Sequence, residues 1–530
     1  MKPGHVDLVA HLVGKNVHMK RLNVLSDMDR LTAVVLIILG SLLIAIAVST
    51  LRWRMGTDSA TFMYYAFLMD RFGYVPYRDI FENNMPGAYF VYLLIGKVFG
   101  YGSEIGFRIA DLTYLVALLG VTWFWLKRFG QKVAWLGIIA FGIVYFREGI
   151  YWSFQREYLT LLPISGAVWM ATSFTNNNVR LKCFGIGLLF GLAALIKPLT
   201  PIGLPFVILY VILDNLENVR NRPRQWIWAL GLIFYGLLGL LSVLLALSIY
   251  LLSTGAMSAF VDIVTNWWPL YNQMDGAFVV LTGPQRLSYM LHRIPSPQLV
   301  YLAPATLGAL IALFQSTLTH PQKRLVLLLS ALAMCYAVYP VLGGKFYSYH
   351  YIIMDYFAAT LGALCLVARP ERARVVLRWL PISVVLIFLF SHIIFFVPGA
   401  PGLSAEEIGG IAAYLKAHSI PGDRVQPLDN VNGALHAMLI ANLEIATPFV
   451  YDWQFYEAVS TPYTQDLRRR FIDGLKATKP MFILKILDSP RPQGPGTAST
   501  FPELQDLLNT DYTSAIATNT YVIYQRQAQN

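Results

Sequence analysis

The sequence has few charged residues and few cysteines for its length. Of its 530 residues, 13% are charged and 56% are hydrophobic, whereas a typical globular chain carries about a quarter charged residues. This composition excludes a disordered chain, a coiled coil and a collagen-like fibre. The three cysteines, Cys183, Cys335 and Cys365, all lie in apolar runs. We therefore interpret them as small core residues and not as a disulfide framework.

Long hydrophobic runs account for the missing charge. A helix needs about 20 mostly apolar residues to cross a bilayer, and the sequence contains about eleven such runs. They begin near Leu31, Leu112, Val133, Leu159, Phe184, Pro201, Trp226, Leu299, Leu325, Tyr351 and Trp379. The predicted fold class is a polytopic α-helical membrane protein. Ala45 and Ala47 in the first run imitate a signal-peptidase site, but the run is too long for a signal peptide, so we expect a retained anchor.

The positions of Lys and Arg indicate the orientation of the chain. Such residues accumulate in short cytoplasmic loops of membrane proteins. Here they lie in the N-terminal leader and in alternate loops at 126–132, 179–182, 218–224, 320–324 and 368–378. One orientation in the plasma (inner) membrane satisfies all of them, with the N-terminus in the cytoplasm and the C-terminus outside. The net charge of +11 therefore needs no nucleic-acid partner.

The composition changes after Val397, where polar residues return at ordinary frequency. We predict a membrane domain over 1–397 and a small extracytoplasmic α/β domain over 398–530, which is a normal domain size. Within the second domain, the patterns predict helices at 405–418 and 467–476, strands at 424–428, 481–486 and 521–525, and a Pro/Gly-rich loop at 491–500.

The loops predicted on the outer side hold ionisable residues at the membrane edge. The first of these loops, 51–105, contains two aromatic-rich amphipathic segments, 59–71 and 88–99, typical of interfacial helices. Ionisable groups at membrane depth are costly, so we expect them to be functional or paired. Those that share the outer side come from four separate loops: Asp58, Glu157, Lys197, Lys345 and His350. Their convergence predicts one site on that side.

Each candidate also has a structural alternative. The alternatives are an N-cap for Asp58, solvated turns for Asp79 and Glu82, an ion pair between Arg156 and Glu157, snorkelling for Lys197 and an ordinary interfacial histidine for His350.

Several short stretches occur in a recognisable order. They are GTDSATFMYYAFLM after the first span, the turn from Pro76 to Gly87, Gln155-Arg156-Glu157, Lys197-Pro198, and Gly344-Lys345-Phe346 followed by His350-Tyr351. Together they resemble the GT-C fold of polytopic glycosyltransferases, and are most similar to the protein mannosyltransferase and aminoarabinose transferase branch (glycosyltransferase family 39-like). The resemblance covers roughly the first 400 residues. One departure is Asn83-Asn84 before Pro86, where relatives often have a basic residue.

The resemblance implies about 11 to 13 transmembrane helices and an inverting glycosyltransferase. Such an enzyme moves a sugar from a polyprenyl-phosphate donor to a hydroxyl of an acceptor glycan, lipid or protein. A carboxylate must take the proton of the attacking hydroxyl, and cations must stabilise the departing phosphate. The resemblance implies that Asp58 is the base, with Glu157 as the second choice. Lys197 is the first candidate for binding the donor phosphate, followed by Arg156, Lys345 and His350. The residues implied in binding the acceptor or the sugar are Asp79, Glu82, Tyr64 and Tyr349.

We expect no metal or other cofactor to be required. No His, Cys or acid cluster has metal-ligand spacing. Asp27-Met28-Asp29 fits an Asp-x-Asp clamp, but it precedes the first span on the cytoplasmic side and is interpreted as a helix start. The rival functions are a transporter or flippase of a lipid-linked sugar, and a non-enzymatic assembly or sensor protein. Transporters usually place ionisable residues near mid-membrane, and here these residues lie at one edge. Membrane lipids are expected partners, and the sequence leaves the oligomeric state open.

Overall fold

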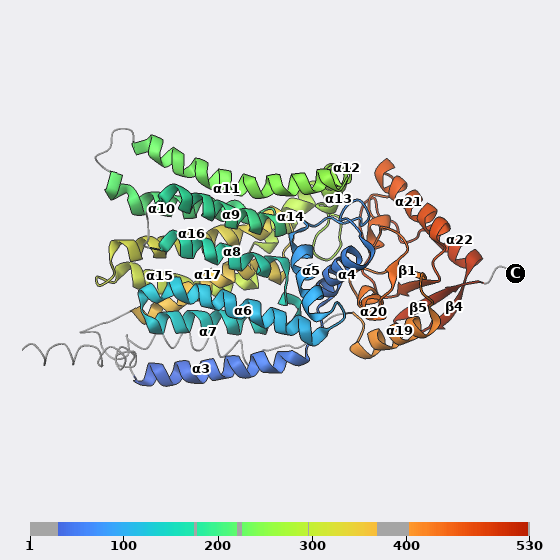
Figure 1. The fold of residues 1–530 in the computed structure, drawn as a ribbon, viewed down its shortest axis with the longest axis horizontal. Coiled ribbons are helices and arrows are strands. Elements are labelled where there is room, and N and C mark those ends of the chain that lie inside the picture. The colour runs from blue at the N-terminus through green and yellow to red at the C-terminus, as the bar shows by residue number, and fades with distance from the viewer. Residues whose placement is uncertain (1–29, 174–177, 220–224, 295, 368–401, 528–530) are drawn as a thin grey trace, which may run out of the picture.

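The computed structural model describes residues 30–173, 178–219, 225–294, 296–367 and 402–527. In this part of the chain, a bundle of helices forms one half of an elongated molecule and an α/β domain forms the other (Figure 1). The predicted domain boundary at 397, the span from Trp379, the basic leader and the Asp27–Asp29 motif lie outside the described residues.

Helices occur at ten of the eleven predicted spans. They are α3 (Arg30–Ser49), α6 (Glu104–Leu126), α7 (Gln131–Arg147), α8 (Arg156–Thr172), α9 (Val179–Ile196), α10 (Leu204–Val219), α11 (Gln225–Ser253), α15 (Leu302–Phe314), α16 (His320–Gly343) and α17 (Ile352–Gly362). Seven helical segments of the described residues are long and apolar enough to cross a membrane, with α15 counted within Gly283–Phe314 and α17 within Ser348–Val367. Helices α7, α8 and α10 are shorter, at 17, 17 and 16 residues. The predicted polytopic helical class is confirmed.

Small residues allow the bundle helices to pack closely. Helices α9 and α11 lie side by side along much of their length (Figure 1). A Cβ atom at Gly187 would lie 1.9 Å from the carbonyl oxygen of Gly236, and one at Gly239 would lie 2.1 Å from that of Phe184. The two backbones therefore touch, as is typical of helix pairs in membranes, where packing rather than the hydrophobic effect holds helices together.

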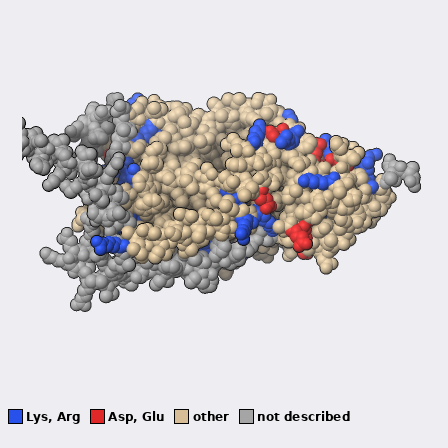
Figure 2. All heavy atoms as spheres, turned by 60° about the horizontal axis from the view of Figure 1, so that its bottom comes forward, with Lys and Arg blue, Asp and Glu red and all other residues tan. Residues whose placement is uncertain are grey.

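Charged side chains are unevenly distributed along the long axis of the molecule. On the face drawn in Figure 2, Lys and Arg lie at the end of the bundle far from the C-terminal domain and again near the junction with that domain. A broad band with almost no charged side chains separates the two groups. Such a band is what a hydrocarbon layer requires of the segments that cross it.

Short helices fill the junction between the bundle and the C-terminal domain. Helices α4 (Thr57–Phe72) and α5 (Gly87–Phe99) come from the two amphipathic segments, and α4 is buried from Ser59 to Leu68. A second group, which the sequence did not predict, comprises α12 (Met257–Asp262), the π-helix η5 (Ile263–Trp267), α13 (Trp268–Tyr271) and α14 (Gly283–Arg293). The 3-10 turns η3 (Gly149–Trp152), η4 (Thr200–Gly203) and η7 (Ser348–Tyr351) complete the junction.

The C-terminal domain contains a five-stranded sheet of order β2-β1-β3-β5-β4. Strand β1 is parallel to β2 and β3, whereas β5 is antiparallel to β3 and β4. The strands are β1 (Arg424–Leu428), β2 (Glu444–Ile445), β3 (Phe482–Ile486), β4 (Tyr512–Ala517) and β5 (Tyr521–Arg526). The helices are α19 (Ala405–His418), α20 (Ala434–Ala441), α21 (Pro462–Thr478) and α22 (Pro502–Asp511). The predicted elements are confirmed, while α20, β2, α22 and β4 were missed.

Direct contacts join the two halves of the molecule. Tyr64 of α4 donates a hydrogen bond to the carbonyl oxygen of Leu443 at 2.8 Å. The Phe81 amide donates to the carbonyl oxygen of Pro448 at 2.8 Å. The ring centroids of Trp267 and Trp453 lie 5.3 Å apart. These contacts hold the C-terminal domain against the loops that carry the candidate residues.

Candidate active site

Two adjoining cavities lie at the junction. The first, of about 270 Å³, is lined by Lys197 and His350, and we name it the Lys197 cavity. The second, of about 280 Å³, is lined by Asp58, and we name it the Asp58 cavity. Seven residues line both cavities, and we name them the shared wall: Asn83, Asn84, Arg156, Tyr271, Lys345, Tyr347 and Tyr349. Side chains from distant loops therefore meet at one place, as sidedness predicted.

The cations of the Lys197 cavity are anchored on a buried carboxylate. Glu157, in the first turn of α8, is fully buried. Its Oε1 atom lies 2.8 Å from Nζ of Lys197 and 3.4 Å from Nε2 of His350, and it accepts a hydrogen bond from the Tyr339 hydroxyl at 3.3 Å. Glu157 lines neither cavity. It therefore positions the residues that do, and Lys197 is held by this pair and does not snorkel.

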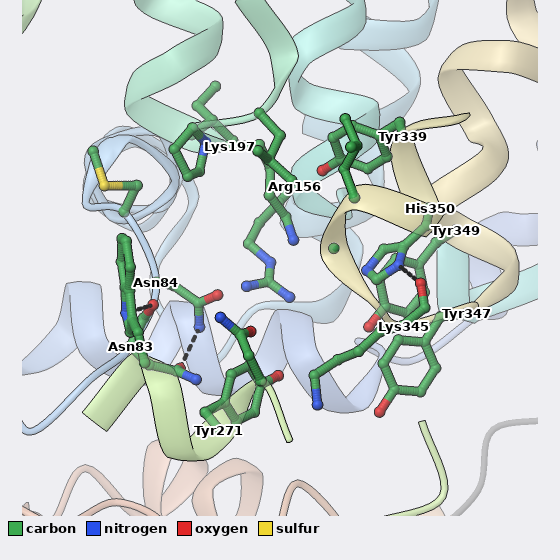
Figure 3. A pocket seen from close by; sticks show the side chains of 18 residues that line it. Asn83, Asn84, Arg156, Lys197, Tyr271, Tyr339, Lys345, Tyr347, Tyr349 and His350 are labelled. Atoms are coloured by element: carbon green, nitrogen blue, oxygen red, sulfur yellow. Dashed lines mark hydrogen bonds between the residues drawn. The ribbon is translucent and has the colours of Figure 1, made fainter. Parts of the chain in front are cut away.

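Arg156 is one of two cations at the shared wall. Figure 3 shows its guanidinium pointing into the cavity between Lys197 and Tyr271. It packs against the Phe62 ring, 5.2 Å from the ring centroid. Among the described residues, its Nε atom has no hydrogen-bond partner and no carboxylate forms an ion pair with it. Arg156 and Glu157 form no contact ion pair, although their charges interact, and the guanidinium is available to an anion.

Lys345 is a second buried cation at the shared wall. Its Nζ atom lies 3.9 Å from the centroid of the Tyr271 ring and donates to the carbonyl oxygen of Met274 at 3.2 Å. Burial lowers the pKa of Lys345 to about 7, and the charge of Glu457 opposes this shift. Burial also lowers the pKa of Lys197, with Glu157 opposing. The cavity thus holds cations that an entering anion would stabilise.

Asp58 is oriented from outside its own helix. It is the second residue of α4, whose N-cap is Gly56, so an N-cap role for Asp58 is wrong. Its Oδ2 atom accepts a hydrogen bond from Nε2 of Gln155 at 2.9 Å. Gln155 follows Phe154, which has a φ of 51°, a backbone conformation unusual for a residue other than glycine. The carboxylate is therefore held at the cavity by the loop before α8.

A buried polar network supports that loop. Arg108 and Asp111 of α6 form a fully buried ion pair at 2.7 Å. Asp111 accepts a hydrogen bond from the Ser153 hydroxyl at 3.1 Å, and the Ser153 carbonyl accepts one from the Ser59 hydroxyl at 2.7 Å. The network thus connects α6, the loop before α8 and the first turn of α4. The signal for it in the sequence is a pair of opposite charges three residues apart inside an apolar run.

The acidic turn of the first loop positions other residues. Glu82 is buried and accepts hydrogen bonds from the backbone amides of Asn83 and Asn84 at 2.8 and 2.9 Å. Burial raises the pKa of Glu82, while hydrogen bonds from Tyr65 and Asn84 and the charge of Arg156 oppose the shift. Glu82 lines neither cavity, but it aims both asparagines at the shared wall.

Two of the candidate residues lie away from the cavities. Asp79 forms an ion pair with Arg78 at 2.7 Å and accepts a hydrogen bond from the Val75 amide at 2.8 Å, as a turn residue does. Tyr64 is buried in the contact with the C-terminal domain. Neither lines either cavity, whereas Tyr349 lines both.

His350 donates from Nδ1 to the carbonyl oxygen of Lys345 at 2.8 Å, so it has partners on both ring nitrogens.

In the part of the chain that the structure describes, no group of three or more His, Cys, Asp or Glu side chains is arranged to hold a metal ion. Independence from metals remains a prediction.

Comparison with known proteins adds a result on the fold. No protein-family model and no curated protein matches the sequence. Among solved structures, ArnT from Cupriavidus metallidurans in the apo state matches 92% of this chain and 97% of its own chain, with 12% identity and a TM-score of 0.55. This chain has the GT-C fold. AglB, an oligosaccharyltransferase from Archaeoglobus fulgidus in complex with an inhibitory peptide and a dolichol-phosphate, matches 86% of this chain and 69% of its own, with 10% identity and a TM-score of 0.45.

The GT-C fold that the motifs implied is therefore confirmed. Sequence reasoning missed the lining residues that come from the second group of junction helices and from the C-terminal domain. They include Trp268, Tyr271, Asn430, Tyr451 and Trp453. The aromatic run TNWWPLY at 265–271 was the available signal for the first two.

Proposed function

We propose that the protein is a glycosyltransferase that moves a sugar from a polyprenyl-phosphate donor to an acceptor hydroxyl at the outer face of the membrane. The observation that carries the proposal is the shared wall of the two cavities. It joins a cavity that is rich in cations, with Lys197 and Arg156, to one that holds the oriented carboxylate of Asp58. The GT-C fold agrees with this function.

The Lys197 cavity suits a lipid phosphate. Lys197, Arg156 and Lys345 outnumber the single carboxylate, Glu157, that contacts Lys197. Phosphate oxygens prefer such charge-assisted hydrogen bonds. The same cavity is lined by apolar side chains from the ends of the bundle helices, including Leu342 of α16. The phosphate would therefore lie among the cations, with its prenyl chain directed along the bundle.

The Asp58 cavity suits the incoming hydroxyl. Asp58 accepts the proton of the acceptor hydroxyl while the acceptor oxygen forms its bond to the anomeric carbon. The bond between that carbon and the phosphate oxygen breaks, and its electron pair stays on the phosphate, where Lys197 and Arg156 stabilise the charge. Nucleophile and leaving group lie on opposite faces of the sugar, so the anomeric configuration inverts. The cations supply the charge that a metal would otherwise supply, so we propose that none is required.

Substitution of Asp58 by Asn tests the proposal. Loss of a general base lowers turnover by about 10² to 10⁴, while donor binding and thermal stability should remain because the shape is kept. The matched control is Asp70→Asn on the same helix, since Asp70 pairs with Lys97 at 3.2 Å and lines neither cavity. Turnover is measured as sugar transferred from a polyprenyl-phosphate donor. Unchanged turnover in Asp58→Asn, or movement of the lipid-linked sugar across vesicles without a new glycosidic bond, would contradict the proposal.

A further inference from the structure

The parallel strands of the C-terminal domain end at the Asp58 cavity. Asn430 follows β1, Trp453 follows β2 and Pro490 follows β3, and all three line that cavity. The site is thus built from two halves: junction helices on one side and strand ends on the other.

The strand order places a ligand-binding crevice at this point. From β1 the chain passes through α20 to β2 on one side, and then returns through α21 to β3 on the other side of β1. The order of the strands therefore reverses between β1 and β3. In open α/β sheets, ligands bind outside the carboxyl ends of the strands at such a switch point. The loops after β1 and β3 occupy this position.

The loop after β1 is fixed before any ligand arrives. Val431, which lines the Asp58 cavity, has a φ of 57°, and a β-branched residue in this conformation is strained. Asp429 holds the loop by accepting five hydrogen bonds, from the Ser489 hydroxyl and from the backbone amides of Asn430, Asn432, Gly433 and Ala434. Strain that is held in place in this way is typical of binding sites.

One side chain of the loop lacks a partner. Asn430 is 3% exposed, and within the described residues its Nδ2 atom has no hydrogen-bond partner. A buried donor left unpaired costs free energy, which an acceptor atom of a ligand would recover. Since Asn430 lines the Asp58 cavity, that acceptor atom would lie in the cavity.

The chemistry of the Asp58 cavity differs from that of its neighbour. Apart from the shared wall, the Asp58 cavity is lined by no Lys or Arg among the described residues. It has the carboxylate of Asp58, the amides of Asn430 and Asn432, and the aromatic rings of Tyr151, Tyr451 and Trp453. When a donor phosphate occupies Arg156 and Lys345 of the shared wall, the charge left facing this cavity is the carboxylate of Asp58, which repels an anionic ligand. Amides bind hydroxyl groups as donors and acceptors, and aromatic faces cover apolar C–H surfaces.

We propose that the C-terminal domain forms the acceptor subsite, and that the acceptor is an uncharged carbohydrate. A hydroxyl oxygen of this carbohydrate accepts a hydrogen bond from Asn430, and a neighbouring hydroxyl faces Asp58. The inference rests on the proposed function, because it names the acceptor of the same reaction.

The test is binding of saccharides, which needs no turnover. The full-length protein, in lipid nanodiscs with saturating polyprenyl phosphate, is titrated with neutral oligosaccharides, their phosphorylated and uronic-acid counterparts, and an acidic peptide. Binding is measured by saturation-transfer NMR. We expect the neutral saccharides to bind preferentially. Asn430→Ala should weaken their binding about tenfold, as expected for one hydrogen bond to a buried group. Tyr151→Ala should weaken it as well, and Tyr151 is 38% exposed, so this variant should fold even if Asn430→Ala does not.

Two controls distinguish a specific loss of saccharide binding from a general loss of structure or of donor binding. Asn509→Ala, an exposed amide on α22, should leave saccharide binding unchanged. Binding of polyprenyl phosphate should be the same in all variants, because the donor phosphate lies in the Lys197 cavity. The inference is overturned if no neutral saccharide binds, if the charged ligands bind better, or if both cavity variants bind saccharides like the wild type. Failure of the proposed function would instead show as unchanged turnover in Asp58→Asn.

Discussion

Replacing Glu157 by Gln tests whether Lys197 binds the donor phosphate. The change keeps the shape of the side chain and removes its charge. In the protein without donor, the carboxylate oxygen that now lies 2.8 Å from Nζ of Lys197 and 3.4 Å from Nε2 of His350 would be replaced by a neutral amide group. The cation would then remain in the cavity with no carboxylate in contact with it.

The magnitude follows from the burial of this pair. Removing one partner of a buried ion pair costs about 3–5 kcal/mol. The Glu157 side chain is fully buried, but that of Lys197 is 17% exposed, so we expect a loss near the lower end, about 3 kcal/mol. A donor phosphate supplies the missing negative charge. Polyprenyl phosphate should therefore stabilise Glu157→Gln more than it stabilises the wild type.

The assay is thermal unfolding in nanodiscs with and without saturating polyprenyl phosphate. The difference in unfolding temperature between wild type and variant should be large without the lipid and should shrink when the lipid is present. Glu148→Gln is the matched control, because Glu148 pairs with Arg147 at 2.9 Å and lines neither cavity. A difference that is the same with and without lipid would show that the phosphate does not reach Lys197, and would refute the reasoning.

Two further predictions concern charge and packing. Because the pKa of Lys345 is lowered to about 7, this lysine is mostly neutral at about pH 8. A bound phosphate raises the pKa of Lys345 again, so donor binding should take up a proton. The proton uptake is measured by calorimetry in buffers of different ionisation heat. Lys345→Arg should abolish the uptake, and uptake that persists would contradict a contact with phosphate. Gly239→Ala places a Cβ 2.1 Å from the carbonyl oxygen of Phe184 and should cost about 1–3 kcal/mol of stability. Gly231→Ala on the same helix meets nothing within 4 Å and should leave the unfolding temperature unchanged or higher; equal effects of the two substitutions would contradict the close packing.

Hydrophobic runs predicted most of the bundle, since a segment that must bury its backbone in lipid has to be a long apolar helix. The junction helices from Met257 to Arg293 were missed for the same reason. They combine short helical segments with a π-helix, and no run of apolar residues marks them. Whether Tyr271 lines a cavity depends on its packing against Trp453, at 5.6 Å between ring centroids, and such a contact between distant segments leaves no local pattern.

The convergence of the candidate residues could be predicted, but not the division of labour among them. Asp58 and Glu157 are both carboxylates in the first turn of a helix near the predicted outer face. The sequence could not decide which of them faces the cavity. The structure distinguishes them by their partners: Glu157 is engaged by Lys197, whereas Asp58 is held by the neutral Gln155.

The difference in partners bears directly on the choice of base. A carboxylate that pairs with a cation is a weaker base, because the cation favours its charged form. Glu157 is paired in this way, and Asp58 receives a hydrogen bond from an amide only. In the proposed reaction, negative charge moves from the Asp58 side of the shared wall to the Lys197 side as the donor bond breaks. Arg156 lines both cavities and has no carboxylate partner in the described residues, so its guanidinium is the group best placed to follow that charge. The arrangement therefore favours Asp58 as the base, Glu157 as the anchor of the cations, and Arg156 as the residue that couples the two cavities.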